Sequence, residues 1–388
     1  MTGKRIHAGR KVWLALLTAL VLAASPALAE MPAGAPGADG GFLTGLAEED
    51  MNFFVNPDAK YAQLAALVRE TARKNSYNGS VVIATDGEVL LYGGPRARTT
   101  EGLPADPYTV YEIGSVTKMF TAVIVLRLME QGKLSMDDPL TRFFPAYEAG
   151  GGITVADLLH MQSGIVDYVN DPVRFFRGDE GLPEGMFSGD GVLTDEVFLN
   201  CLYAAEPEAE PGTRFDYSNS NYHLLALIIE QVEGIPYEEA VRTMIFEPCG
   251  MTHSSSVSTG DETSVPDSDA GYNLFQKGSR GAGDIHSCMA DLIAFDRALF
   301  GGRLISAESL ELMKDFGTGG YGCALYPYAK RAYGHSGSIS SYVTQNVVIE
   351  SEDYGRVYFA ACTSTAAGWY GLDTVMQAVL RQMGAHKP

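Results

Sequence analysis

The stretch "YEIGSVTKMFTAVIVLRLMEQGKL", residues 111–134, decides the fold, because it predicts a helix that is apolar on almost every side. Such a helix lies at the centre of a domain, with other elements packed around it. Ser115 and Lys118 stand near its start, three residues apart, and therefore share one face. An amine buried there loses hydration, so we expect the pKa of Lys118 to fall. A neutral lysine can act as a base and would activate the hydroxyl of Ser115 as a nucleophile.

Two plainer explanations of this pair remain open at this stage. A serine and a lysine at this spacing occur by chance on the order of once in a chain of 388 residues. Ser115 or Thr117 is also a residue type that caps a helix. The pair therefore needs support from other parts of the chain.

Segments with β-strand character lie early and late in the chain, with helical segments between them. Asp86-Gly87 separates two β-rich runs within residues 79–94, which predicts a hairpin. Residues 340–350 and 356–364 are also β-rich. Helices are expected at residues 61–74, 222–233, 237–246, within 284–302 and at 372–383. We therefore predict an α+β fold (an α/β sandwich), in which one antiparallel sheet is built from N- and C-terminal segments and flanked by helices, next to a mostly helical lobe.

The first 29 residues have the organisation of a secretory signal peptide. Four basic residues precede the apolar run "VWLALLTALVLAAS", and small residues at 27–29 form a cleavage site. An uncleaved membrane anchor is the alternative, although the apolar run is short for a full span. Residues 30–58 start rich in Gly, Ala and Pro and predict a flexible linker. We expect a secreted or extracytoplasmic protein, in the cell envelope or periplasm, without a stable membrane span after cleavage.

Charge and cysteine usage exclude several classes of partner and site. The formal charge of −20 disfavours binding to nucleic acid and to anionic lipid. The five cysteines are widely spaced, which favours buried thiols over a disulfide framework. The histidines do not form a ligand pair such as HExxH, so we predict no metal and no cofactor. The sequence does not indicate an oligomeric state.

A second motif is "FDYSNSNY", residues 215–222, ahead of a predicted helix. The phenol of Tyr217 can move a proton when it lies near a cation, and Asn219 can bind a peptide carbonyl or amide. The same letters also suit a turn followed by a helix cap. Tyr168-Val169-Asn170 has the same Y-x-N form, so either match alone is weak.

A third motif is "YGHSGSISSYV", residues 333–343, in which His335-Ser336-Gly337 opens a β-rich run. A glycine early in a strand often permits close approach of a ligand to the backbone. An edge strand can offer N–H groups to a substrate and to an oxyanion. A lone histidine, however, more often has a structural role.

Taken in chain order, the three motifs resemble those of the serine β-lactamase-like and penicillin-binding protein family, in its class C and DD-carboxypeptidase branch. Longer segments of the chain are also similar to those of the family, namely "PGTRFDYSNSNYHLLALIIEQVEGIPY", "IFEPCGMTHS" and "GAGDIHSCMADLIAF". The first of these segments favours Tyr217 over Tyr168. The resemblance runs from about Tyr61 to the C-terminus. It implies a single catalytic domain at residues 59–388, with the α/β part at about 59–113 and 290–388 and the helical lobe at about 114–289.

The resemblance also implies the roles of the site residues. Ser115 would attack a carbonyl and form an acyl-enzyme, while Lys118 and Tyr217 share the role of base. The backbone N–H groups of Ser115 and Ser338 would form the oxyanion hole. Asn219 would orient the acyl side of the substrate. The implied substrate-binding residues are Asn219, His335, Ser336, Gly337 and Ser338, of which His335 and Ser336 would meet a carboxylate or assist Tyr217.

The chain departs from the family pattern at three places. Met161 stands where a histidine is usual, and we expect that position to support structure. Ser338 replaces a common glycine, which could alter the oxyanion hole. His335 stands where class C β-lactamases have a lysine. In this respect the chain resembles DD-carboxypeptidases, esterases and D-aminopeptidases more closely than class C β-lactamases.

The expected ligand is a small-molecule or peptide acyl substrate. A D-Ala-D-Ala carboxypeptidase-type, penicillin-binding hydrolase is the leading interpretation, because export fits a cell-wall target. The alternatives are a class C-like β-lactamase, a carboxylesterase or D-aminopeptidase, and a β-lactam or wall-fragment sensor without turnover. The acidic residues 170–195 would border the cleft and could set specificity.

Overall fold

A β-hairpin near the N-terminus starts the main sheet of this computed structural model. β2 (Gly79–Thr85) and β3 (Val89–Gly93) pair in antiparallel fashion around Asp86-Gly87, as the sequence predicts. The backbone N–H of Thr85 closes the turn on the carbonyl of Glu88 at 2.8 Å. The structure describes residues 53–94, 97–100, 102–176, 193–256, 279–339, 341–365 and 368–385. The predicted signal peptide, residues 30–52 of the predicted linker and residues 177–192 of the acidic segment lie outside these ranges.

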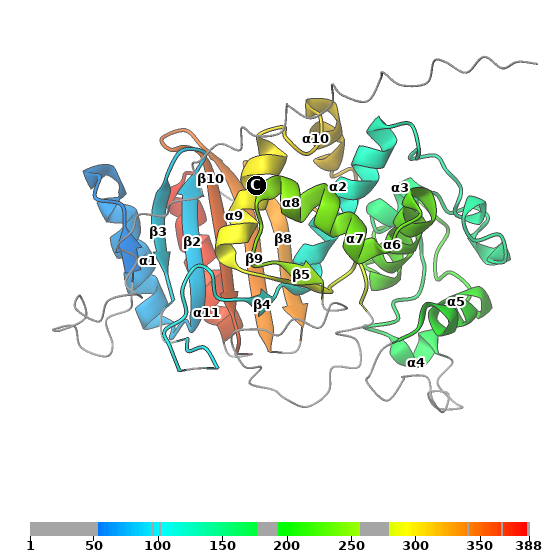
Figure 1. The fold of residues 1–388 in the computed structure, drawn as a ribbon, viewed down its shortest axis with the longest axis horizontal. Coiled ribbons are helices and arrows are strands. Elements are labelled where there is room, and N and C mark those ends of the chain that lie inside the picture. The colour runs from blue at the N-terminus through cyan, green and yellow to red at the C-terminus, as the bar shows by residue number, and fades with distance from the viewer. Residues whose placement is uncertain are drawn as a thin grey trace, which may run out of the picture. The chain divides into compact units, whose positions relative to one another are not determined.

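Both ends of the chain contribute to one antiparallel sheet of seven strands, which confirms the predicted fold class (Figure 1). Its order is β1-β3-β2-β10-β9-β8-β7, and β2 pairs with β10 along its whole length. The other strands are β1 (Phe53–Val55), β7 (Tyr326–Ala329), β8 (Ala332–Ile339), β9 (Tyr342–Ser351) and β10 (Gly355–Thr363). The linker prediction is wrong for its last residues, since Phe53–Val55 pair with β3 and extend the sheet.

Helices cover the two faces of the sheet. α1 (Ala62–Lys74) and α11 (Gly368–Gln382) pack together and share a core with one set of alternating strand residues, such as Val81 and Phe359. α9 (Met289–Phe300) covers the other face, where Asn346 of β9 bonds to Asp296. Figure 1 shows α9 in front of the sheet and α11 behind it.

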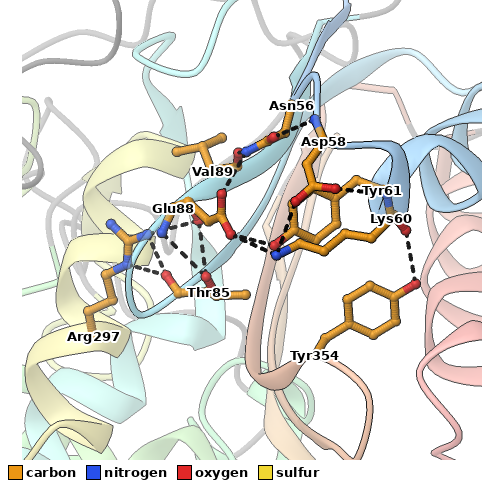
Figure 2. Close-up of polar contacts among 9 residues, drawn as sticks. All are labelled: Asn56, Asp58, Lys60, Tyr61, Thr85, Glu88, Val89, Arg297 and Tyr354. Carbon is orange, nitrogen blue, oxygen red and sulfur yellow. Dashed lines mark hydrogen bonds and ion pairs between the residues drawn. The ribbon is translucent and has the colours of Figure 1, made fainter.

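A polar network fastens the N-terminal segment to the hairpin turn (Figure 2). The carboxylate of Glu88 accepts hydrogen bonds from Asn56 at 2.9 Å, from the Tyr61 hydroxyl at 2.5 Å and from Lys60 at 3.3 Å. From α9, the guanidinium of Arg297 donates to the carbonyls of Thr85 and Glu88. The turn is therefore held from both sides of the sheet.

The opening stretch forms a shorter helix than the sequence predicts. Tyr111–Glu112 is a strand, β4, which pairs with β6 (Ile285–Ser287) in a small sheet whose third strand is β5 (Ser255–Ser256). Gly114–Val116 is a 3-10 turn, and the helix α2 covers Thr117–Glu130. Eleven of its residues are buried, including Lys118, so the predicted central position is confirmed.

The remaining helices form the lobe beside the sheet. They are α3 (Val155–Leu159), α4 (Pro172–Phe175), α5 (Asp195–Ala204), α6 (Asn219–Glu233), α7 (Tyr237–Val241), the π-helical Arg242–Phe246, α8 (Glu247–Cys249) and α10 (Ala307–Met313). Short 3-10 turns lie at Ala59–Tyr61, Leu140–Arg142 and Glu148–Gly150. All five cysteines lie in the described residues, where none of them forms a disulfide, and four of them are buried. Over the described residues, each helix is too short or too polar to span a bilayer.

Candidate active site

Ser115 lies in the tight turn between β4 and α2. Gly114 adopts a φ of +52°, a backbone conformation that favours glycine, and it directs the chain from the strand into the helix. The N–H of Ile113 donates to the carbonyl of Ile285 at 3.1 Å, and the N–H of Ile285 donates to Thr117 Oγ1 at 3.2 Å. These bonds fix the turn against β6, so the hydroxyl of Ser115 has a defined position on the wall of a cleft.

Lys118 lies one helical turn later and is fully buried beneath Ser115. Its Nζ is 3.1 Å from Ser115 Oγ, 2.7 Å from Asn219 Oδ1 and 2.6 Å from the carbonyl oxygen of Ala282. Burial lowers the pKa of Lys118 to about 7, although the nearby carboxylates of Asp167 and Asp284 oppose the shift. A substantial fraction of the amine is therefore neutral at neutral pH, as the sequence predicted.

Tyr217 completes the surroundings of the serine. Its hydroxyl donates to Ser115 Oγ at 2.9 Å, and Lys118 Nζ lies 5.0 Å from the centre of its ring. Burial raises the pKa of Tyr217 well above its usual value, while the bond to Ser115 partly opposes this. The phenol therefore keeps its proton at neutral pH and acts as a donor toward Ser115.

Asn219, the first residue of α6, bridges Lys118 to a carboxylate that the sequence did not single out. Its Oδ1 accepts from Lys118, and its Nδ2 donates to the two oxygens of Asp167 at 3.2 and 3.0 Å. Both ends of the amide are thus engaged by protein groups. In this structure the side chain of Asn219 orients Lys118, whereas the sequence suggested that it grips the substrate.

The His335 motif lies within β8, not at the start of a strand as the sequence suggested. His335 is buried, and its Nε2 lies 3.0 Å from the hydroxyl of Tyr321. Burial and the charge of Lys118 lower the pKa of His335 to about 3, so its ring is neutral at physiological pH. A neutral ring cannot form an ion pair with a substrate carboxylate.

The end of β8 has one open edge. β7 pairs only with Ala332–Gly334, whereas β9 pairs with β8 as far as Ile339. Among the described residues, no strand pairs with residues 335–339 on the side away from β9. This edge borders the cleft that contains Ser115.

Gly337 and Gly114 allow the serine turn to touch β8. A Cβ atom on Gly337 would lie 1.9 Å from the carbonyl oxygen of Ile113 and 3.1 Å from the backbone nitrogen of Ser115. A Cβ on Gly114 would lie 3.0 Å from the backbone nitrogen of Ser338. The sequence correctly suggested a close backbone approach at Gly337, but the approaching group is the serine turn. The contact brings the Ser115 and Ser338 backbones together.

The cleft has a volume of about 400 Å³ and contains all the predicted site residues except Lys118, which lies beneath its wall. It is lined by Gly114, Ser115, Val169, Asn170, Tyr217, Asn219, Ser279, Ala282, Gly283, Tyr326, His335, Ser336, Gly337, Ser338, Ile339 and Trp369. Neither lysine nor arginine occurs among these described lining residues.

Three groups around Lys118 were not among the predicted site residues: Asp167, the carbonyl of Ala282, and Asp284, although the last two lie in the family-like segment "GAGDIHSCMADLIAF". The buried carboxylate of Asp284 accepts from the N–H of Gly281 at 2.9 Å and from Ser256 at 3.1 Å, which shapes the loop that carries Ala282. Burial raises the pKa of Asp284 to about 6. Only the folded chain brings these groups to the lysine.

The structure also shows why the competing Tyr168-Val169-Asn170 motif does not supply the tyrosine beside Ser115. Tyr168 is buried, and its ring contacts those of Phe175 and Phe198, so it cannot reach the serine. Asn170 is exposed and lines the cleft, where Asp167 accepts from its Nδ2 at 2.5 Å. The sequence was right to prefer Tyr217, but this segment contributes to the site through Asp167 and Asn170.

Met161 has the supporting role expected of its position. It is buried with a φ of +56°, and its sulfur accepts from the N–H of Ser218 at 3.5 Å and from Asn221 Nδ2 at 3.3 Å. The sulfur thus holds the segment that carries Tyr217 and Asn219. The neighbouring His160 contacts the carbonyl of Tyr321 through Nδ1 at 3.2 Å.

In the part of the chain that the structure describes, one cluster of metal-binding residue types lies outside the cleft. His253, Cys288 and Asp291 place their donor atoms within 4.8 Å of one another. Hydrogen bonds account for this arrangement, because Asp291 accepts from the His253 N–H and Ser254, and Cys288 Sγ accepts from the Asp291 N–H. Burial raises the pKa of both Cys288 and Asp291, which disfavours their metal-binding forms. The cluster caps the start of α9.

Comparison with known families agrees with this geometry. The family model described as Beta-lactamase matches residues 64–379, most of the chain. This chain belongs to the Beta-lactamase family.

Individual relatives of this family member include penicillin-binding proteins. One from Bacillus subtilis (strain 168) is 27% identical over 345 residues, which cover 82% of this chain and 68% of that protein. The chain spans 62% of the length of a second Bacillus subtilis relative, with 31% identity over 265 residues.

Solved structures with the same fold include an octameric penicillin-binding protein homologue from Pyrococcus abyssi, at 30% identity and a TM-score of 0.65, covering 84% of this chain and 77% of that one. A D-stereospecific amidohydrolase from Streptomyces sp. is 25% identical with a TM-score of 0.64, covering 81% of this chain and 97% of its own.

Proposed function

We propose that this member of the Beta-lactamase family is an extracytoplasmic, penicillin-binding hydrolase of the D-Ala-D-Ala carboxypeptidase type. The observation that carries the proposal is the position of Ser115 Oγ, between the amine of Lys118 at 3.1 Å and the phenol of Tyr217 at 2.9 Å. This arrangement supplies a nucleophile, a base and a proton donor within hydrogen-bonding reach of one another. Location outside the cytoplasm rests on the predicted signal peptide.

In the first half of the reaction, Ser115 attacks the substrate carbonyl. Neutral Lys118 has two N–H groups and one lone pair, and the oxygens of Asn219 and Ala282 accept the N–H groups. The lone pair is then directed at Ser115 Oγ and accepts its proton as the new C–O bond forms. The N–H groups of Ser115 and Ser338 stabilise the resulting oxyanion.

Collapse of this intermediate breaks the bond to the leaving group and produces the acyl-enzyme. Tyr217 donates its proton to the leaving nitrogen and recovers one from Lys118, so the two groups titrate as a coupled pair. Water then attacks the acyl carbonyl, Lys118 removes its proton, and the return of that proton to Ser115 Oγ breaks the ester bond and releases Ser115. This division of roles assigns the base to Lys118 and the donor to Tyr217, rather than a shared base.

The open edge of β8 favours a peptide substrate. An extended peptide can pair with a free strand edge through backbone hydrogen bonds, and residues 335–339 present such an edge beside Ser115. The relationship to penicillin-binding proteins favours a cell-wall peptide as the donor of the acyl group.

A second candidate, hydrolysis of a neutral D-amino acid amide or an ester, is favoured by a different observation. A carboxypeptidase substrate ends in a carboxylate, and a cation in the cleft would bind it. The described lining residues include neither lysine nor arginine, and His335 is neutral. The similarity to a D-stereospecific amidohydrolase supports the same candidate.

A panel of acyl donors tests these proposals. Purified protein is incubated with fluorescent penicillin and, separately, with nitrocefin, a D-Ala-D-Ala tripeptide, a D-amino acid amide and a nitrophenyl ester. Release of D-Ala with lasting penicillin label supports the carboxypeptidase. Rapid clearance of the label indicates a β-lactamase, and lasting label without turnover of any donor indicates a sensor. Turnover confined to the amide or ester contradicts the carboxypeptidase proposal.

Ser115→Ala tests the nucleophile in the same assays. We expect loss of both label and turnover, and Ser309→Ala, at a half-buried serine on α10 that does not line the cleft, should leave both unchanged. Retained turnover by Ser115→Ala would mean that a different residue forms the acyl-enzyme.

A further inference from the structure

The carboxylate of Asp167 lies directly behind the amide of Asn219, on the side away from Lys118. Asp167 is 8% exposed, and both of its oxygens accept from Asn219 Nδ2. On the other side of the same amide, Asn219 Oδ1 lies 2.7 Å from Lys118 Nζ. A continuous path of hydrogen bonds therefore connects Asp167 to the candidate base.

The other partners of Asp167 are also N–H donors. Its Oδ1 accepts from the backbone of Val169 at 2.8 Å and of Asn170 at 3.3 Å, and its Oδ2 accepts from Asn170 Nδ2 at 2.5 Å. The two backbone bonds close a turn around Asp167. The side chain thus joins a turn at the cleft wall to the start of α6.

An acceptor at this position fixes the orientation of the Asn219 amide. A carboxylate can only accept, so the amide must direct its NH₂ group to Asp167 and its oxygen to Lys118. The oxygen then occupies one N–H of the neutral amine, and the carbonyl of Ala282 occupies the other. If the amide turned over, its NH₂ group would face an amine that donates, and the lone pair of Lys118 would lose its direction.

We propose that Asp167 is a positioning residue, which locks the amide of Asn219 and thereby directs the lone pair of Lys118 at Ser115 Oγ. This inference rests on the proposed role of Lys118 as the base. Asp167 touches neither Ser115 nor the open cleft, and it acts through Asn219.

The charge of Asp167 gives the inference a second measurable consequence. Lys118 is faced by the carboxylates of Asp167 and Asp284, by the rings of Tyr217 and Tyr222, and by neutral His335. Burial lowers the pKa of Lys118, and Asp167 raises it. Removal of the Asp167 charge should therefore lower the pKa of Lys118 further and extend activity to lower pH.

The test measures kcat/KM against pH for Asp167→Asn and Asp167→Ser, with the donor from the panel that the wild-type protein hydrolyses. Asparagine offers an NH₂ group that competes with that of Asn219. Serine retains an oxygen for the turn at Val169 and Asn170 but is too short to hold Asn219. We expect the plateau of kcat/KM to fall roughly 10- to 100-fold in both variants. We also expect the acid limb of the profile to move to lower pH.

Asp157→Asn is the matched control. Asp157 is a half-buried carboxylate on the same lobe, where it caps α3 without lining the cleft. Its loss should lower stability but leave the acid limb unchanged. For the two Asp167 variants, a plateau of kcat/KM within twofold of wild type would overturn the inference. A lower plateau with the acid limb of the pH profile unchanged would also overturn it.

A double variant separates positioning from general loss of folding. Because Asp167 acts through Asn219, Asp167→Ser added to Asn219→Ala should lower the plateau less than twofold beyond Asn219→Ala alone. Additive losses would overturn the inference. If Ser115→Ala kept its turnover, the proposed function would fail instead, so the two failures can be distinguished.

Discussion

Two buried aspartate–asparagine pairs occupy different parts of the molecule and are built differently. In the helical lobe, Asp167 accepts from Asn219, from two backbone N–H groups and from Asn170. In the α/β part, Asp296 of α9 accepts only from Asn346 Nδ2, at 2.9 Å. Among the described residues, Asp296 Oδ2 and Asn346 Oδ1 have no hydrogen-bond partner.

The difference shows how surroundings decide the form of a carboxyl group. Several N–H donors around Asp167 suit an ionised carboxylate, which only accepts. Burial with a single donor raises the pKa of Asp296 to about 8. The protonated acid can donate to Asn346 Oδ1, which provides a partner for both unpaired oxygens. One pair thus supplies an anion near Lys118, whereas the other is a neutral contact between α9 and the sheet.

The largest expected effect is that of removing Lys118, because the Asp167–Asn219 pair acts on that residue. Lys118→Ala should lower kcat/KM roughly 1,000-fold or more, nearly as much as Ser115→Ala, since members of one catalytic unit are not additive. Steady-state kinetics with the donor identified by the panel measures this. The control is Lys133→Ala, an exposed lysine paired with Glu233, which should remain within twofold of wild type. A comparable fall in the control would assign the effect to folding.

The second largest effect is expected from moving the turn that carries Ser115. The Asp167–Asn219 pair can orient Lys118 usefully only while Ser115 faces that lysine. Gly337→Ala would place a methyl group 1.9 Å from the carbonyl oxygen of Ile113. The turn or β8 must move, and we expect about a 100-fold fall in kcat/KM. Gly87→Ala is the control, since open space surrounds that hairpin glycine. Unchanged acylation of Gly337→Ala by fluorescent penicillin would contradict the close contact.

The pH profile of the wild-type protein tests the effect of the surroundings on Lys118 without any substitution. Lys118 must be neutral to accept a proton, and its pKa is lowered to about 7. Activity should therefore rise with pH through about 7, and kcat/KM should fall about tenfold for each pH unit below that value. A profile that stays flat from pH 5 to pH 8 would exclude Lys118 as the base.

The smallest expected effect is on the free energy of unfolding. Replacing the aspartate by asparagine should raise this free energy in the Asp296 pair and lower it in the Asp167 pair. Folding keeps Asp296 protonated up to a pKa of about 8, although an exposed aspartate ionises near 3.8. The folded state binds the extra proton, so this group makes the protein less stable as pH rises from about 4 to 8.

Asp296→Asn removes that titration and still offers a donor to Asn346. We expect stabilisation by about 1–2 kcal/mol at pH 8 and a smaller effect at pH 5, measured by denaturant unfolding. Asp167→Asn should destabilise at both pH values, because it leaves N–H donors without acceptors. Equal effects of Asp296→Asn at the two pH values would show that Asp296 is ionised in the folded state.

The sequence predicted most of the fold because the relevant signals are local. Asp86-Gly87 fixed the hairpin, and the apolar helix after Ser115 fixed the centre of the domain. The start of that helix was placed too early, since Tyr111–Glu112 pair with β6, a partner more than 160 residues away. The pairing of Phe53–Val55 with β3 was missed for a related reason, because the Gly- and Pro-rich start of residues 30–58 masked a three-residue strand.

The chemical groups of the site can be read from the chain alone: a serine, a lysine on its helix face, and a tyrosine and a histidine within family-like motifs. What each of these groups faces depends on the fold. It placed Asp167 behind Asn219, directed the carbonyl of Ala282 at Lys118, and turned His335 toward Tyr321. Hydrogen bonds depend on distance and direction between atoms, and these partners, which are 52, 164 and 14 residues apart in the chain, acquire both only when the chain folds.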